Sequence, residues 1–179
     1  MCLEVPVARI PYYELDEKDQ DKMELVGRAP KLNVIRIMAH AAYPVLNGFV
    51  TLVAALLAEG RLDPFLREMA IIRTGLLCGS EYEVFQHHKM ARRMGMPEEK
   101  IRALAVGSTS PVFSEVEKLV LGFTEEMVTR RKASEETFKA LAGHFSPARM
   151  VELAIVVGCY VMVSMFLMTF EVDIEQKHG

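Results

Sequence analysis

The sequence has few of the cysteines that stabilise small proteins through disulfide bonds or bound metal ions. It has only three cysteines, Cys2, Cys78 and Cys159, and no two of them stand in a C-x-x-C pair or at a zinc-binding spacing. An odd number of cysteines without such a framework argues against a disulfide scaffold and favours reducing surroundings. We therefore expect a cytoplasmic protein whose thiols fill space in the core.

An excess of positive charge is also missing. The formal net charge is −3, and the one basic cluster, residues 130–132, suits the end of a helix. Nucleic acid is therefore not an expected partner. Residues 1–17 carry acids and prolines where a signal sequence would need a positive start and an apolar run, so we do not expect a targeting segment.

Long apolar runs are rare, with one exception at residues 150–170, where Glu152 is the only charge. This run is long enough to span a membrane. However, no basic cluster flanks it, the residues after it are acidic, and Gly158 and Ser164 dilute it. We favour a central helix that is buried on all sides over a membrane span, and we expect no membrane partner.

Alternation of apolar and polar residues with period two is absent, so the sequence predicts an all-α fold. The 179 residues, 51% of them hydrophobic, suit one globular domain. We place an N-terminal arm and a short helix at residues 1–30, because Pro6 and Pro11 keep the start extended. The helical domain is predicted over residues 31–179.

Signals for the start and end of helices frame the most polar part of the domain. Asp63 and Pro64 begin a helix that carries Glu68, and Gly79 ends it. Ser80 and Glu83 then match the S-x-x-E capping box at the start of the next helix.

Glu83 and His87 lie one helical turn apart, so the carboxylate can orient the imidazole for acid/base work. Glu68 can add a second carboxylate and Tyr82 a hydroxyl, and apolar surroundings would raise carboxylate pKa values. The plainer alternatives are that Glu83 serves only the capping box, that His87 or its neighbour His88 faces solvent, and that Tyr82 is an ordinary core residue. A metal site built on Glu and His lacks enough ligands, so neither metal nor cofactor is expected.

The pattern R-E-x(11)-S-x-x-E-x-x-x-H resembles the carboxymuconolactone decarboxylase and AhpD-like superfamily over roughly residues 31–172. AhpD-like disulfide reductases use E-x(11)-C-x-x-C-x-x-x-H, whose positions fall here on Glu68, Ser80, Glu83 and His87. The resemblance implies an AhpD-like helical bundle, a small-molecule substrate and a homo-oligomer such as a dimer, trimer or hexamer.

This chain departs from that pattern at both redox cysteines, because Ser80 and Glu83 stand in their places. A peroxiredoxin-type alkylhydroperoxidase activity, which the family also suggests, therefore lacks its thiols. The decarboxylase branch of the family also lacks the cysteine pair and keeps an acid and a histidine.

Two functions from different classes follow. In the first, a lyase-like enzyme uses Glu68 and His87 as acid and base, Glu83 as orienter or second acid, and Tyr82 as donor to an enolate. An oxyacid substrate would need a cation, for which Arg67, Arg73, Lys89 and Arg92 are candidates. In the second, the protein is a non-catalytic helical binding protein.

Overall fold

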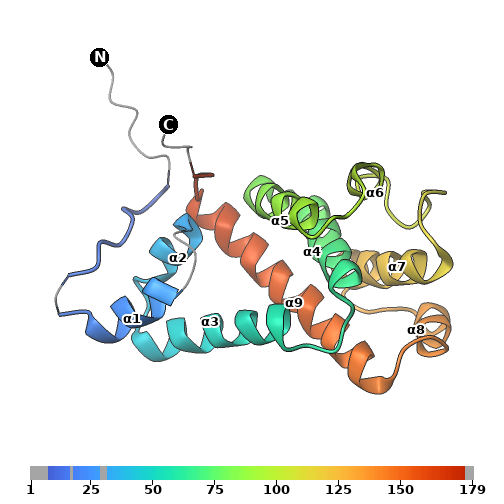
Figure 1. Ribbon diagram of the computed structural model, residues 1–179, viewed down its shortest axis with the longest axis horizontal. Helices are drawn as coiled ribbons and strands as arrows, with labels where there is room; N and C mark the ends of the chain where they lie inside the picture. The colour runs from blue at the N-terminus through green and yellow to red at the C-terminus, as the bar shows by residue number, and fades with distance from the viewer. Residues whose placement is uncertain (1–7, 17, 29–31, 176–179) are drawn as a thin grey trace, which may run out of the picture. The chain divides into compact units, whose positions relative to one another are not determined.

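The computed structural model describes residues 8–16, 18–28 and 32–175. Within these residues it has nine helices and no strand, which confirms the predicted all-α class (Figure 1). The helices are α1 (Gln20–Arg28), α2 (Asn33–Met38), α3 (Tyr43–Ala58), α4 (Pro64–Cys78), α5 (Glu81–Arg93), α6 (Glu98–Ala103), α7 (Glu115–Arg130), α8 (Glu135–Ala142) and α9 (Pro147–Phe170).

The chain divides into two compact units, which are described separately. Unit 1 combines residues 1–59 with 167–179, and unit 2 runs from Gly60 to Phe166. The boundary at residue 30 that we expect from the sequence is a different division and stays a prediction.

In unit 1, the described part of the N-terminal arm lies along the C-terminal residues. The amide of Arg9 donates to the carbonyl of Phe170 at 2.9 Å. The hydroxyl of Tyr12 donates to the carboxylate of Asp173 at 3.0 Å. These bonds tie the two ends of the described chain together, whereas residues 1–7 of the predicted arm lie outside the described residues.

In unit 2, α4 packs against both α5 and α7 (Figure 1). The sequence explains where this central helix begins and ends, as predicted. The Asp63 side chain accepts hydrogen bonds from the first free amides of α4, and Pro64 stands at its first position. At the other end Gly79 has a φ of 75°, a left-handed conformation that costs glycine little.

A core of buried apolar side chains fills the space between α4, α5, α6 and α7. Because α4 contributes Met69 and Ile72 to it without any exposed surface, this helix is fixed in position and orientation. The core consists of Met69, Ile72, Ala91, Met96, Ile101, Ala103, Leu104, Phe113 and Leu121.

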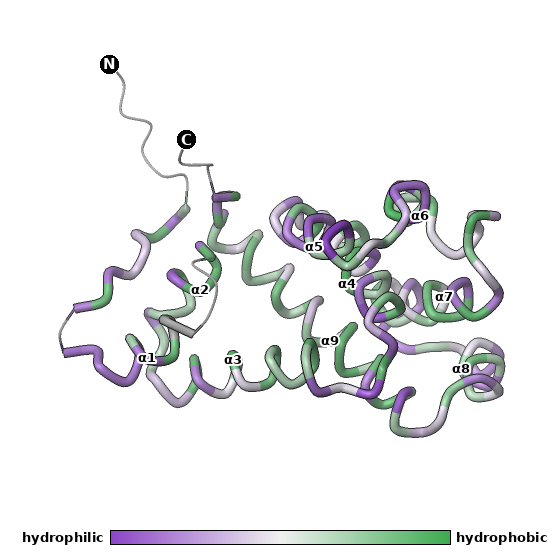
Figure 2. The backbone as a smooth tube through the Cα atoms, in the orientation of Figure 1, coloured by the Kyte–Doolittle hydropathy of each residue, from purple (hydrophilic) through white to green (hydrophobic). Residues whose placement is uncertain are grey.

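The long apolar helix predicted at the C-terminal end is present as α9, and Figure 2 colours most of its length as apolar. The prediction that it is buried on all sides is wrong. Leu153, Val157 and Tyr160 on one face are buried, but Val151 and Met165 on the opposite face are about 60% exposed. Among the described helices, α9 alone is long and apolar enough to cross a membrane by length and composition.

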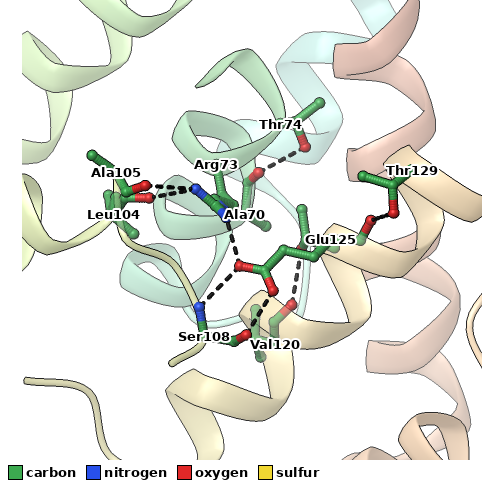
Figure 3. A network of polar contacts seen from close by, with 10 residues as sticks. Ala70, Arg73, Thr74, Leu104, Ala105, Ser108, Val120, Glu125 and Thr129 are labelled. Atoms are coloured by element: carbon green, nitrogen blue, oxygen red, sulfur yellow. Dashed lines mark hydrogen bonds and ion pairs between the residues drawn. The ribbon is translucent and has the colours of Figure 1, made fainter. Parts of the chain in front are cut away.

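A network of polar groups joins α4 to α7 and to the loop before α7 (Figure 3). The Arg73 guanidinium donates to the Glu125 carboxylate at 2.9 Å and to the carbonyls of Leu104 and Ala105. Glu125 also accepts from the amide and the hydroxyl of Ser108. Arg73 therefore has a structural role.

Gly107 lies inside this network, so replacing it tests how much the network contributes. It has a φ of 88°, and a Cβ added there would collide with the Glu125 carboxylate and the Arg73 guanidinium. We expect Gly107→Ala to lower the free energy of unfolding by about 1–3 kcal/mol, measured by urea denaturation. The control is Gly48→Ala in α3, where an added Cβ meets nothing within 4 Å and helix propensity predicts a gain of up to about 1 kcal/mol. Equal effects at both positions would contradict the prediction.

Candidate active site

Three of the four residues singled out from the sequence meet in the interior of unit 2. Nδ1 of His87 lies 2.7 Å from Oε2 of Glu68, and Nε2 of the same ring lies 3.0 Å from Oε1 of Glu83. Glu68 has no exposed surface, while Glu83 and His87 retain 4% and 7%. One imidazole is therefore held at both nitrogens by buried carboxylates from two helices.

The packing of α4 against α5 brings these groups together. Glu83 and His87 lie one turn apart on α5, and Glu68 reaches them from α4 after the chain reverses at Gly79. Gly75 on α4 permits the close approach, because a Cβ there would lie 3.1 Å from Val84 and 3.4 Å from Glu83. The positions of both carboxylates therefore depend on the same helix pair.

The protonation of His87 follows from its neighbours. Burial disfavours the charged ring, but the hydrogen bonds and negative charges of Glu68 and Glu83 outweigh it and raise the pKa of His87 to about 9. At neutral pH the ring is therefore an imidazolium that donates both of its protons. Its charge is stabilised by the two groups that orient it.

The capping box predicted for Ser80 and Glu83 does not form. The side chain of Ser80 makes no capping hydrogen bond, and its buried Oγ has no partner among the described residues. The Glu83 carboxylate instead pairs with His87 at i+4. The choice that the sequence left open for Glu83 is thus decided by a contact within the site.

Tyr82 is buried on α5, but neighbouring residues on a helix point in different directions, so it does not share the face of Glu83 and His87. The aromatic ring at His87 is that of Tyr160 on α9, perpendicular to the imidazole with 5.0 Å between centroids. Burial, reinforced by the charges of Glu83 and Glu68, raises the pKa of Tyr160 well above its usual range. Sequence reasoning missed Tyr160, although a lone tyrosine in an apolar run is a signal because a buried hydroxyl needs a partner.

Of the four candidate cations, Arg67 is the one beside the site. Its Nε lies 4.0 Å from Oε1 of Glu68, and within the described chain neither atom makes a hydrogen bond. Arg73 belongs to the network with Glu125. Arg92 pairs with Glu98, and Lys89 lies over the Phe85 ring.

A separate pocket of about 300 Å³ opens elsewhere in unit 2, and none of the histidine-binding residues contributes to it. Its polar groups are Lys100 and Glu117, which pair with each other. The lining residues are Phe65, Met69, Gly95, Met96, Pro97, Lys100 and Glu117. Within the described residues, no group of three or more His, Cys, Asp or Glu side chains is arranged to hold a metal ion.

Part of the chain matches the model of a known family. Residues 43–126, which include Glu68, Glu83 and His87, match the model of the carboxymuconolactone decarboxylase family. The curated protein YnjA of Escherichia coli K12, which is uncharacterized, is 32% identical over 99 residues. That match spans 54% of this chain and only 54% of YnjA.

Solved structures share the fold. An uncharacterized peroxidase-related protein of Ralstonia eutropha JMP134, with an alkylhydroperoxidase AhpD core, is 20% identical with a TM-score of 0.80 over 97% of this chain and 95% of its own. A peroxidase-related protein of Silicibacter sp. TM1040 is 17% identical with a TM-score of 0.81 over 98% and 94%. A variant of the debrominase Bmp8 in complex with 2,3,4-tribromopyrrole is 18% identical with a TM-score of 0.76 over 94% of each chain. These likenesses confirm the predicted AhpD-like helical fold.

The raised pKa of His87 predicts how stability depends on pH. A group whose pKa is raised on folding stabilises the protein fully below its unfolded pKa of 6.5, and this contribution is lost as the pH rises through about 9. We expect the difference in unfolding free energy between the wild type and His87→Gln to shrink by about 3 kcal/mol over that range. Urea denaturation on both sides of the range measures it. A difference that stays constant with pH would contradict an imidazolium at this site.

Proposed function

We propose that this protein is a cofactor-free enzyme of the carboxymuconolactone decarboxylase type that decarboxylates a small organic acid or lactone, or moves a proton next to its carbonyl group. The observation that carries the proposal is the imidazolium of His87, bonded at both nitrogens to Glu68 and Glu83. A buried group that holds a transferable proton at a pKa of about 9 suits general acid catalysis.

The solvent exposure of the two glutamates suggests a different role for each carboxylate. Glu68 has no exposed surface and binds Nδ1, so it orients the ring and stabilises its charge. Glu83 binds Nε2 and retains a small exposed area, so it is the carboxylate through which a proton leaves or enters. This assignment exchanges the roles that the sequence alone suggested for the two acids.

The proposed reaction begins when the bond between the substrate's carboxylate and its α-carbon breaks. The electron pair stays on the α-carbon as an enolate, and CO2 leaves. A proton passes from Nε2 of His87 to the Glu83 carboxylate and from Glu83 to that carbon, so Glu83 ends the step as a carboxylate again. The neutral ring, still held by Glu68 through Nδ1, regains its proton from solvent.

A substrate carboxylate needs a cation to bind it. Arg67 is the best candidate, because Arg73 and Arg92 are already paired with glutamates and Lys89 lies over the Phe85 ring. Arg67 as a residue is 6% exposed and lies beside Glu68, and its Nε makes no hydrogen bond in the described chain. An arginine binds carboxylates well because its donors form a planar fork. The charges of Arg67, Glu68, Glu83 and His87 also sum to zero, so the resting site is neutral overall.

Thiol chemistry of the kind that the peroxidase-related structures suggest is the second candidate, and the geometry favours it less. Ser80 and Glu83 hold the positions of the redox cysteines. Burial raises the pKa of the Cys78 thiol, which leaves it protonated and a weak nucleophile. A purely structural protein is also less favoured, because that alternative expects Glu83 to serve the capping box.

The first test of the proposal replaces the imidazole. His87→Gln keeps an amide that can donate to one carboxylate but cannot exchange protons, so we expect turnover to fall by about 10²-fold or more. The assay supplies a panel of β-keto acids and carboxylated lactones, and follows CO2 release and deuterium uptake from D2O by NMR. Circular dichroism checks that the variant folds.

The matched control is His88→Gln, the neighbouring histidine on α5, which has no part in the Glu68 and Glu83 network. We expect it to retain wild-type turnover. The proposal fails if the wild type transforms none of the panel, or if both glutamine variants keep the same rate.

A second test separates the two tyrosines. We expect Tyr160→Phe to lower kcat by about tenfold, because it removes the hydroxyl from the ring packed on His87. Tyr82→Phe removes a hydroxyl of equal size from the other buried candidate on α5. If the enolate donor is Tyr82, as the sequence suggests, the larger loss in kcat falls on that variant instead.

A further inference from the structure

Two serine hydroxyls of unit 2 are buried without a hydrogen bond. Ser80, at the start of α5, is 2% exposed, and Ser164 on α9 has no exposed surface. Within the described chain, the Oγ of each makes no hydrogen bond. A buried hydroxyl without a partner costs free energy, so native structures keep few of them unless a ligand or a water satisfies the group. Each of these hydroxyls is therefore available to bind another group.

Ser80 lies on the same face of α5 as the candidate site. Glu83 follows it by three residues and His87 by seven, and residues at these spacings lie on one side of a helix. The Ser80 side chain makes no capping hydrogen bond, so it is not committed to its own helix. The start of α5 is also the positive end of its helix dipole, which favours a negatively charged group nearby.

Ser164 reaches the same end of the site from α9. It follows Tyr160 by four residues, so it shares the face that packs on His87. The Cys78 thiol lies beside it, because burial raises the pKa of that thiol and the Ser164 side chain offsets part of the rise. Since Cys78 ends α4 and stands two residues before Ser80, Ser164 lies at the turn where α5 begins.

We propose that Ser80 and Ser164 together bind the substrate oxygen that becomes negatively charged when the enolate forms. This inference rests on the proposed function, because that oxygen belongs to the carbonyl next to the carbon that Glu83 protonates. Hydroxyls that are already in place stabilise such a charge without reorganisation during the reaction. An enolate oxygen accepts more than one hydrogen bond, so the two serines act together with a tyrosine donor.

An ordered water is the other group that could satisfy these hydroxyls. A water explains their burial, but it gives no reason for their position on the faces of Glu83 and Tyr160, whereas a substrate oxygen does. The turn before α5 also leaves space, because a Cβ added to Gly79 would meet nothing within 4 Å. The geometry therefore favours a substrate oxygen, and a water alone is one outcome of the test.

Binding of a stable enolate tests the two serines without any turnover. Tetronate, the anion of tetronic acid, is a lactone enolate at neutral pH, and γ-butyrolactone is a similar ring without the charge. Titrations followed by NMR give both dissociation constants. We expect Ser80→Ala and Ser164→Ala each to weaken tetronate binding by about tenfold or more, because each removes a hydrogen bond to a charged oxygen. Binding of γ-butyrolactone should change much less.

The matched control is Thr124→Val on α7, which removes a buried hydroxyl that already donates to the carbonyl of Val120. It should leave tetronate binding unchanged. Urea denaturation separates binding from structure. Ser80→Ala should not lower the unfolding midpoint, because its hydroxyl caps nothing, whereas alanine in place of a capping serine lowers it.

The inference is overturned if the wild type binds tetronate no better than γ-butyrolactone. It is also overturned if both serine variants bind tetronate as tightly as the wild type, which would leave an ordered water alone as the occupant. Loss of binding that occurs only together with a lower unfolding midpoint would assign the serines a structural role instead.

Failure of the proposed function gives a different result. A wild type that binds tetronate through both serines, yet transforms none of the acids and lactones in the panel, upholds the oxygen site and overturns only the reaction. Conversely, a wild type that transforms the panel at a rate that neither serine variant changes overturns only the oxygen site.

Discussion

One interaction sets the requirements for the rest of unit 2: the buried imidazolium of His87 between the carboxylates of Glu68 and Glu83. Charges in a protein interior lose their hydration, so they persist there only when each is paired in good geometry. The ring needs one acceptor on each side, and these come from two different helices. A small displacement of α4 against α5 would therefore leave a charge unpaired.

Several features of the fold hold these two helices in register. The left-handed turn at Gly79 reverses the chain, and Gly75 lets α5 approach α4 where Glu83 stands. On the far side of α4, Arg73 binds Glu125 and the loop carbonyls before α7 (Figure 3). The two arginines of α4 therefore have different roles. Arg73 holds the helix in place through Glu125, whereas Arg67 lies beside the candidate site.

α9 has two apolar faces with different surroundings. Its inner face brings Tyr160 to His87, where the phenol experiences the charges of both carboxylates. Its outer face leaves apolar side chains such as Val151 and Met165 exposed. A helix with apolar residues on every face is predicted from sequence to be a core helix. In this chain, however, only one face of α9 is buried.

The sequence by itself determined the all-α class, the start of α4 at Asp63 and Pro64, and the candidate residues Glu68, Glu83 and His87, because these follow from local caps and the helical repeat. Only the tertiary structure decided whether Glu83 caps α5 or binds His87, since both partners lie within one turn and the choice depends on Glu68 arriving from α4. Tertiary packing also brought Tyr160 to the site from a distant part of the chain. Periodicity describes which face of a helix a residue occupies, whereas the neighbour on that face is set by how the helices pack.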